Sequence, residues 1–239
     1  MPFNFQLITD INDHSTAQDF SNVIRKWLDH MPEKCWPNWV IGNHDNSRVA
    51  SRLGKELADG MNMINLLLPG TAITYYGEEI GMVDTFIRWD QTLDPGAINA
   101  GYENFKKFTR DPARTPFQWD SSSNAGFSTS YRTWLPVNPN HWYLNLNEQK
   151  ITSRSHFHVY KRLAHLRLDP VFQYGKLDLF VLSKWVFAFT RKLEKGDTFI
   201  IIINLGADEE FINLYDKISY LPSIVTVHTC SINSEYEIG

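Results

Sequence analysis

Short apolar runs alternate with amphipathic helical patterns over the first 80 residues of the chain. Three of the runs, Phe3 to Ile8, Trp39 to Gly42 and Ala72 to Tyr76, have the length expected of buried strands. Apolar residues at helical spacing fill the interval from Phe20 to Met31, and a second helix is expected from about Lys55 to Leu68. The order strand, helix, strand, helix, strand is typical of βαβ units, so we expect a parallel sheet with right-handed crossovers.

Residues that start or stop helices mark the limits of these two helical patterns. Ser15 and Gln18 stand at the spacing of a capping box ahead of the first helix, and Pro32 ends it. Pro69-Gly70 ends the second helix. Since parallel sheets gather functional groups at the carboxyl ends of their strands, the polar residues after the second and third strands lie where a site is expected.

The periodic pattern stops after the third expected strand. Residues from Gly81 to Gln149 are rich in Asn, Asp, Pro, Ser and Gly, which indicates a long loop over about 82–150. Loops of this length inside a compact domain are usually functional. A third helix is expected from Ser155 to Leu168, with these side chains facing inward: Phe157, Tyr160, Leu163, Ala164 and Leu168.

The chain changes from helical to strand periodicity near residue 175. From Lys176 onward, short β patterns separated by turn residues predict a small antiparallel sheet or sandwich. The expected strands are Asp178–Leu182, Trp185–Thr190, Thr198–Asn204, Glu210–Leu214 and Ile224–Thr229. We therefore divide the chain into a first domain over residues 1–175 and a C-terminal β domain over residues 176–239.

Composition excludes several classes of protein. With 239 residues, 43% hydrophobic and 21% charged, the chain has the composition of a soluble globular protein. A net charge of −4 without basic runs argues against a nucleic-acid partner. The apolar runs are too short to cross a bilayer, and no leader peptide is expected at the start. Cys35 and Cys230 lie far apart and match no metal-binding spacing.

The first candidate for chemistry is the segment Asn43-His44-Asp45, which follows the second expected strand. It places an imidazole next to a carboxylate at a strand end, where Asp45 can serve as a base, a ligand or an electrostatic stabiliser and His44 can donate to hydroxyls. The alternative is a polar turn whose Asn and Asp side chains only hold the backbone. Two adjacent residues do not decide between these interpretations.

The second candidate is the pair Arg110 and Arg114, which stand four residues apart among proline and aromatic residues. Guanidinium groups form forked hydrogen bonds to hydroxyls or carboxylates, so this pair can bind a polar ligand. The alternative is a structural clamp in which both arginines form salt bridges across the long loop.

Taken together, these segments resemble the α-glucosidase branch of the α-amylase family, and their residues are most similar to those of insect maltases. The resemblance runs through nearly the whole chain, is dense from 36 to 170, and becomes sparse in the β region. It rests on five segments in order: Asn-His-Asp-Asn-x-Arg at 43–48, Leu-Pro-Gly followed by Tyr-Tyr-Gly-Glu-Glu-Ile-Gly-Met at 68–82, Arg-Asp-x-Ala-Arg-Thr-Pro-Phe-Gln-Trp-Asp at 110–120, Asn-Ala-Gly-Phe at 124–127 and Trp-Leu-Pro-Val-Asn-Pro at 134–139.

The resemblance implies a (β/α)8 barrel, the TIM barrel, followed by a small antiparallel β domain. It implies hydrolysis of terminal α-1,4-linked glucose from maltose, sucrose or short oligosaccharides by a retaining mechanism with two carboxylates. By the same resemblance, Asp45 matches the third carboxylate, which stabilises the transition state, and His44 matches its histidine neighbour. Arg110 and Arg114 match arginines that line the substrate pocket, while Glu78 and Glu79 are interpreted as structural.

The resemblance also implies that two catalytic groups are missing from this chain. In this family the nucleophile follows the fourth barrel strand in a Gly-Phe-Arg-x-Asp segment, the acid follows the fifth, and neither segment occurs here. The similar residues Phe86 to Asp90 lie after the eighth strand. The chain is then expected to be a fragment that holds barrel strands 6–8 and ends within the β domain. Because such a piece leaves strand edges unpaired and an apolar face exposed, we expect chain 1–239 alone to be unstable or aggregated, and inactive.

A non-catalytic member of the same fold is the main alternative. The glucosidase-like ectodomains of amino-acid transporter heavy chains are expected to have lost the His-Asp and Arg-x-x-x-Arg pairs, both of which occur here. A stand-alone binding module is a weaker alternative, since the chain would start within the barrel.

No cofactor is expected; relatives that bind Ca²⁺ exist, but this sequence has no evident ligand cluster. The resemblance implies α-glucoside partners and a secreted or extracellular, membrane-anchored location, with membrane contact only if the full-length protein is anchored.

Overall fold

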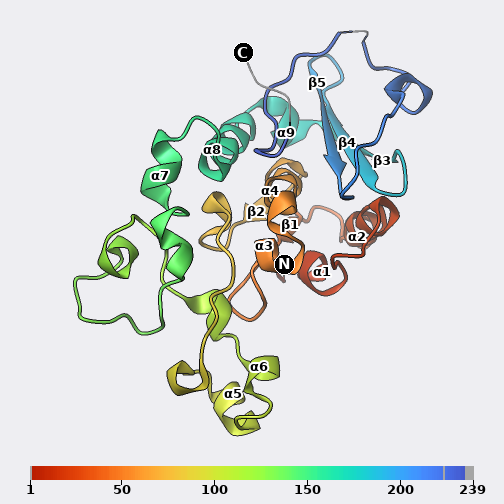
Figure 1. Cartoon of the computed structure of the whole chain (residues 1–239). Coiled ribbons are helices and arrows are strands. Elements are labelled where there is room, and N and C mark those ends of the chain that lie inside the picture. Colours follow the sequence, from red (N-terminus) through yellow and green to blue (C-terminus); the bar gives the residue numbers. More distant parts are fainter. Residues whose placement is uncertain (1, 223, 235–239) are drawn as a thin grey trace. The chain divides into compact units, whose positions relative to one another are not determined.

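The computed structural model of the chain describes residues 2–222 and 224–234. Two compact units are present, and each is built from separate stretches of sequence (Figure 1). Unit 1 comprises Met1–Ile41, Gly60–Ile73 and Arg162–Gly239, and unit 2 comprises Gly42–Asp59 and Thr74–Lys161. The division into domains at residue 175 stays a prediction.

Two short parallel strands in unit 1 confirm the expected βαβ order. Strand β1 (Asn38–Val40) pairs with β2 (Thr71–Ile73) in a parallel register that sets Trp39 opposite Ala72. The Trp39 side chain is fully buried, and its ring nitrogen donates a hydrogen bond to the carbonyl of Pro69 at 2.7 Å. Between the strands, the chain forms α3 (Val49–Arg52), the 3-10 turn η1 (Lys55–Leu57) and helix α4 (Ala58–Leu67).

The first expected strand, Phe3 to Ile8, is wrong: the chain forms helix α1 over Gln6–Thr9. In a strand, side chains alternate between two faces, so Phe3 and Phe5 would be buried on the same face as Leu7. Phe3 and Phe5 are instead 62% and 42% exposed, whereas Leu7 and Ile8 are buried next to each other. Adjacent buried residues fit a helix better than a strand. The residues before α1 still lie beside β1, because Asn38 accepts from the Asn4 amide at 2.8 Å and donates to the Pro2 carbonyl at 2.9 Å.

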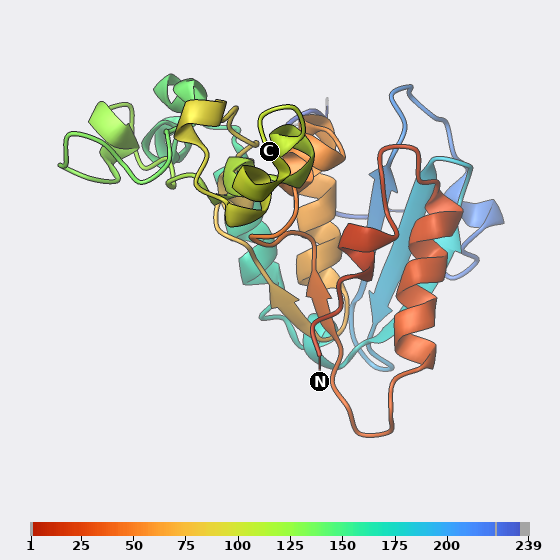
Figure 2. The same ribbon diagram turned by 90° about the horizontal axis from the view of Figure 1, so that it is seen from below.

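Helix α2 (Ala17–Asp29) confirms the first expected helix, with its start shifted by one residue. Thr16 is the N-cap and forms the capping box with Asp19, in place of the expected pair Ser15 and Gln18. In unit 1 this helix packs along the C-terminal sheet, where the rings of Phe20 and Phe187 lie 6.2 Å apart (Figure 2).

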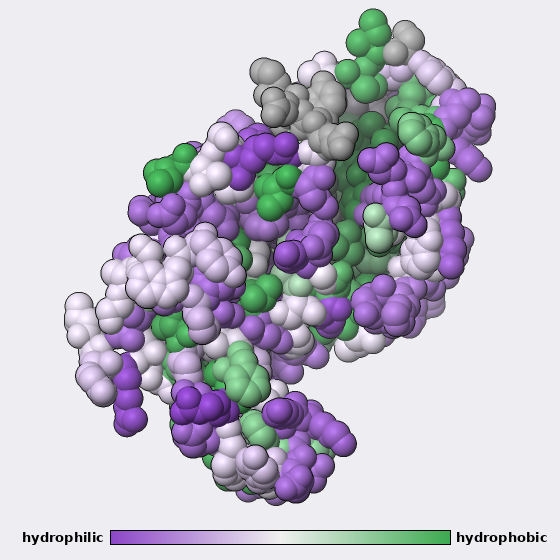
Figure 3. Space-filling model, in the orientation of Figure 1, coloured by the Kyte–Doolittle hydropathy of each residue, from purple (hydrophilic) through white to green (hydrophobic). Residues whose placement is uncertain are grey.

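The C-terminal sheet is antiparallel, as predicted, with β4 (Val186–Lys192) between β3 (Lys176–Val181) and β5 (Thr198–Asn204). The face shown in Figure 3 carries hydrophobic side chains over this sheet. The expected strands Glu210–Leu214 and Ile224–Thr229 are wrong, because their described residues form no strand. Instead, Asn213 caps the 3-10 turn η7 (Leu214–Asp216), a local hydrogen bond that competes with strand pairing.

The long loop over about 82–150 belongs to unit 2, and its described residues form short helical segments rather than strands. Its core contains Ile80, Met82 and Phe117, with Tyr76 and Leu144 packed against them. The 3-10 turn η2 (Glu78–Ile80) precedes the loop. The segments of the loop are η3 (Trp89–Gln91), α5 (Pro95–Ala100), α6 (Phe105–Phe108), η4 (Asp111–Arg114), η5 (Ser123–Gly126), η6 (Pro139–Trp142) and α7 (Leu146–Ile151).

The third expected helix is present as α8 (His156–Leu166) and is followed by α9 (Pro170–Tyr174). Leu163 is fully buried as expected, and Val159, which was not expected, is buried as well. The inward position expected for Leu168 is wrong: this side chain is 66% exposed because the helix ends two residues earlier. Within the described residues, no helix combines the length and apolar character needed to span a membrane.

Candidate functional site

The turn that follows β1 is held by the side chain of Asn43. Its Oδ1 accepts hydrogen bonds from the Asp45 amide at 2.9 Å and from the Asn46 side chain at 3.0 Å. This Asx turn is the structural role considered for these residues from the sequence. It also fixes the backbone of Asp45, so that the carboxylate leaves the turn in a defined direction.

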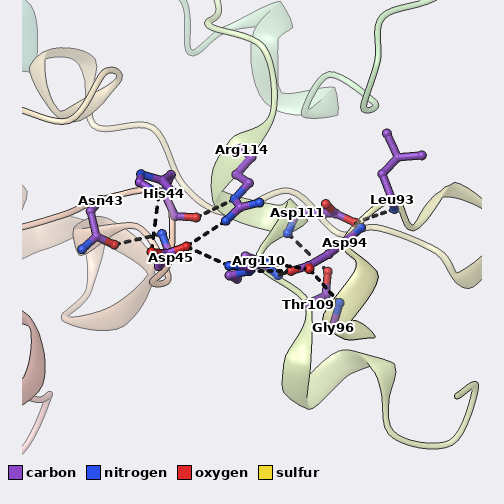
Figure 4. Close-up of polar contacts among 10 residues, drawn as sticks. All are labelled: Asn43, His44, Asp45, Leu93, Asp94, Gly96, Thr109, Arg110, Asp111 and Arg114. Carbon is purple, nitrogen blue, oxygen red and sulfur yellow. Dashed lines mark hydrogen bonds and ion pairs between the residues drawn. The ribbon is translucent and has the colours of Figure 1, made fainter. Parts of the chain in front are cut away.

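Unit 2 brings the four predicted site residues together around the Asp45 carboxylate (Figure 4). Asp45 Oδ1 accepts from Arg110 Nη1 at 3.1 Å and from Arg114 Nη2 at 2.8 Å. His44 Nε2 lies 3.4 Å from the other oxygen, Oδ2. Arg114 also donates through Nε to the His44 carbonyl at 2.6 Å, so it binds both a side chain and a backbone carbonyl of the turn.

Arg110 is anchored on its far side by Asp94, which the sequence did not reveal as part of the site. Arg110 donates from Nε to Asp94 Oδ2 and from Nη2 to Asp94 Oδ1, both at 2.8 Å, and its own amide donates to Oδ2 at 2.8 Å. The Asp94 side chain has no exposed surface, whereas the Arg110 side chain is 40% exposed. The guanidinium therefore bridges a buried carboxylate and the half-exposed carboxylate of Asp45.

The segment that carries Arg114 is fixed by the tyrosines that follow β2. Tyr75 donates its hydroxyl to the Ala113 carbonyl at 3.0 Å, and Tyr76 donates to the Thr115 carbonyl at 2.7 Å. Both tyrosines belong to the motif identified in the sequence, but their contacts are long-range and could not be derived from spacing.

The tyrosine pair is in turn supported by the buried Arg48. Arg48 Nη1 donates to the Tyr76 carbonyl at 2.6 Å, and its guanidinium lies 4.7 Å from the Tyr76 ring centroid. Cation–π contacts of this kind are stronger where the cation is removed from water. The residues that touch Asp45 are thus held by a second layer of side chains from other parts of unit 2.

The surroundings of Asp45 favour its ionised form. Burial alone would raise its pKa, but the neighbouring His44, Arg110 and Arg114 together hold the pKa below its usual value. Hydrogen bonds from Arg110 are the largest influence on Asp94 and hold its pKa well below the usual range. Because both arginines bind Oδ1, Asp45 can offer Oδ2 as an acceptor beside a histidine nitrogen. Neighbouring acceptor and donor groups of this kind suit a pair of sugar hydroxyls.

Glu78 and Glu79, interpreted from the sequence as structural, hold the turn after β2. Glu78 Oε2 accepts from the Tyr75 amide at 3.0 Å, and Glu79 Oε2 accepts from the Gly77 amide at 2.7 Å. Burial raises the pKa of both carboxyls, that of Glu78 the more strongly. A Cβ on Gly42 would lie 2.5 Å from Glu78 Oε1, which explains a glycine just before the Asn43 turn.

In the segment Phe86 to Asp90, which is similar to the nucleophile segment of the family, the two charged side chains bind each other. Arg88 and Asp90 pair with each other through two hydrogen bonds of 2.9 and 2.7 Å, and both side chains are more than 60% exposed. Over residues 2–222 and 224–234, no group of three or more His, Cys, Asp or Glu side chains is arranged to hold a metal ion.

The low pKa of Asp94 leads to a testable pH dependence of stability. An ordinary aspartate in the unfolded chain has a pKa of about 3.9. Because the folded-state pKa is lower, the stabilisation from Asp94 is complete above about pH 5 and is lost as the pH falls below about 4. We expect Asp94→Asn to reduce the free energy of unfolding at pH 7, with the difference from wild type shrinking towards pH 3.

This dependence can be measured by urea unfolding of the whole protein that carries this chain, at pH 7, 5 and 3. Asp90→Asn is a suitable control because its carboxylate is exposed and its ion pair with Arg88 contributes little. A difference between wild type and Asp94→Asn that stays constant over this pH range would contradict the expectation.

Residues 1–175 match the family described as alpha amylase, catalytic domain. The chain belongs to this family. The chain is 42% identical to maltase A1 of Drosophila melanogaster, over all of this chain and 41% of the relative. It is 41% identical to a salivary alpha-glucosidase of Aedes aegypti, over 87% of this chain and 36% of the relative.

The α-amylase-family chain is also similar to solved structures and to one transporter subunit. A trehalulose synthase from Pseudomonas mesoacidophila is 30% identical with a TM-score of 0.74, over 85% of this chain and 42% of that one. These neighbours are TIM-barrel enzymes, so the two parallel strands and the three-stranded sheet confirm the predicted partial barrel and β domain. The human amino acid transporter heavy chain SLC3A1 is 37% identical over 93% of this chain and 30% of the relative. The chain thus spans about two-fifths or less of the length of these relatives.

Proposed function

We propose that this chain contributes the transition-state-stabilising side of the active site of a retaining α-glucosidase. The single observation that supports this most directly is the Asp45 carboxylate, fixed through Oδ1 by Arg110 and Arg114 beside His44. The similarity to a relative named maltase A1, 42% identical over the whole of this chain, and to one named salivary alpha-glucosidase, 41% identical over 87% of it, also supports the proposal. The proposed substrates are α-1,4-glucosides such as maltose, sucrose and short oligosaccharides.

The proposed chemistry follows from the charge and the direction of Asp45. A glucosyl unit placed against Asp45 Oδ2 would donate one hydroxyl to this oxygen and share a neighbouring hydroxyl with His44 Nε2. Positive charge develops on the sugar ring in the oxocarbenium-like transition state, so a fixed carboxylate stabilises it more than the ground state. Arg110 and Arg114 keep this carboxylate ionised and in place, which avoids reorganisation during the reaction.

The nucleophile and the acid are proposed to lie in other parts of the protein that carries this chain. Among the groups of this chain, the Phe86 to Asp90 segment is unsuitable, because Asp90 is bound to Arg88 at the surface. The protein is proposed to act outside the cell, because one relative is named a salivary alpha-glucosidase. No cofactor is proposed for the reaction.

The test of this function is hydrolysis of p-nitrophenyl α-D-glucopyranoside by the whole protein, with the β-anomer as the control substrate. We expect the α-glucoside alone to be cleaved, and proton NMR to show α-glucose as the first product, as retention requires. Release of β-glucose first would contradict the retaining mechanism. Absence of hydrolysis would contradict the enzyme assignment.

A non-catalytic transporter heavy chain is the second candidate, and the similarity to SLC3A1 is the observation in its favour. This candidate predicts no hydrolysis of either anomer and stable association with a multi-span membrane protein after mild detergent extraction. The ionised, anchored Asp45 favours the enzyme, since a protein that binds no sugar has no need of this arrangement.

A further inference from the structure

Arg110 and Asp111, at the start of η4, form a reciprocal clasp in unit 2 with Leu93 and Asp94, the two residues before α5. Arg110 binds the Asp94 carboxylate through its side chain and its amide. Next to it, Asp111 Oδ2 accepts from the amides of Leu93 and Asp94 at 2.8 and 3.0 Å. Asp94 and Asp111 are 2% and 1% exposed, so the clasp closes the base of the segment that contains α5 and α6 in the interior of the unit.

Within this clasp, the Arg110 guanidinium has its donors divided between two carboxylates. Nε and Nη2 face Asp94 in a forked pair, whereas Nη1 faces Asp45 Oδ1. A forked arginine–carboxylate pair fixes the plane of the guanidinium as well as its position. The direction of Nη1, and through it the orientation of the Asp45 carboxylate, therefore depends on Asp94.

We propose that Asp94 is a positioning residue for the sugar site, acting on Asp45 through Arg110. The proposal rests on the proposed glucosidase function and adds a residue to it that does not touch the substrate. Without Asp94, Arg110 keeps its charge but loses the partner that fixes its plane. The Asp45 carboxylate is then held at Oδ1 by Arg114 alone and can rotate away from the sugar hydroxyls.

A purely local role for Asp94 is the competing explanation, because this residue is also the N-cap of α5. Its Oδ1 accepts from the Gly96 amide at 3.0 Å, and Pro95 occupies the first helical position. Serine caps helices about as well as aspartate but cannot form the forked pair with Arg110. Asp94→Ser therefore removes the forked pair with Arg110 and keeps the cap, which separates the two roles.

The test compares Asp94→Ser with Asp90→Ser in the whole protein. Both substitutions remove a carboxylate that accepts two hydrogen bonds from the guanidinium of an arginine in the same loop, but only the arginine bound to Asp94 also contacts Asp45. We expect Asp94→Ser to lower kcat/KM for p-nitrophenyl α-D-glucopyranoside by roughly 10- to 100-fold, as small misplacements of catalytic groups do. Asp90→Ser should leave kcat/KM within about twofold of wild type, since an exposed ion pair contributes little.

Binding of a glucose-configured iminosugar, measured by calorimetry, tells positioning from a general loss of folding. Asp94→Ser should weaken binding in the wild-type background but not in the Asp45→Asn background, whereas its effect on the melting temperature should be the same in both. Equal weakening in both backgrounds, or unchanged kcat/KM in Asp94→Ser, would overturn the positioning role while wild-type hydrolysis still supports the enzyme. A wild-type protein that neither hydrolyses the glucoside nor binds the iminosugar would overturn both.

Discussion

Replacement of Asp45 by asparagine is expected to abolish most of the proposed glucosidase activity of the whole protein and to leave its fold intact. The carboxylate is 48% exposed and its backbone is held by Asn43, so the amide fits the same space without a buried group losing its partner. What the substitution removes is the negative charge. We expect kcat to fall by about 100- to 1000-fold, the loss typical of removing one electrostatic stabiliser of a transition state.

The effect should lie in kcat rather than in KM, because the charge of Asp45 acts on a positive charge that exists only in the transition state. Steady-state kinetics with p-nitrophenyl α-D-glucopyranoside provide the measurement, together with thermal melting of the same samples. The matched control is Asp90→Asn, whose exposed carboxylate pairs with Arg88 in the loop. Near-normal kcat in Asp45→Asn would remove this residue from the mechanism.

The parts of this fold that follow local rules could be predicted from the sequence. Strand β1 is a short apolar run before a polar turn, and α2 is an amphipathic stripe with a capping box at its start. The prediction was wrong where two local patterns compete. Phe3 to Ile8 fits both a strand and a helix, and only the burial of Leu7 and Ile8 shows that the helix is formed.

The four residues expected at the candidate site lie together in the structure, whereas their geometry could not be derived from the sequence and their roles stay predictions. Asp45, Arg110 and Arg114 were candidates because of their side-chain chemistry and the family resemblance of their segments. The sharing of one Asp45 oxygen by two arginines depends on the folding of the loop and could not be derived in that way. Asp94 was missed because Asp94-Pro95 also fits an ordinary helix N-cap, which it is. The role of Asp94 as a helix cap is evident from the local sequence, whereas its contact with Arg110 is long-range and cannot be derived from sequence spacing.

Arg191 is the residue of unit 1 whose replacement is expected to destabilise the protein most. Its side chain is fully buried, and it donates to the carbonyls of Leu67, Phe172 and Gly175 at 2.9 to 3.3 Å. These carbonyls lie at the C-terminal ends of α4 and α9, where helices leave acceptors unpaired and carry partial negative charge. Burial, and next the charge of Arg167, lower the pKa of Arg191 to about 10, so it remains charged at neutral pH.

Arg191→Ala is expected to lower the free energy of unfolding by roughly 3–5 kcal/mol, because each buried carbonyl left without a donor costs about 1–3 kcal/mol. Arg191→Lys should lower the free energy of unfolding by less than Arg191→Ala does, since lysine keeps the charge but lacks the forked donors that reach two helix ends. The control is Arg25→Ala, an exposed arginine that also donates to a backbone carbonyl, that of Leu179 at 3.3 Å. Urea unfolding of the whole protein measures the free energy of unfolding of these three variants. Equal stability of Arg191→Ala and Arg25→Ala would show that the carbonyls at these helix ends find other donors, and that Arg191 does not hold α4 and α9 in place.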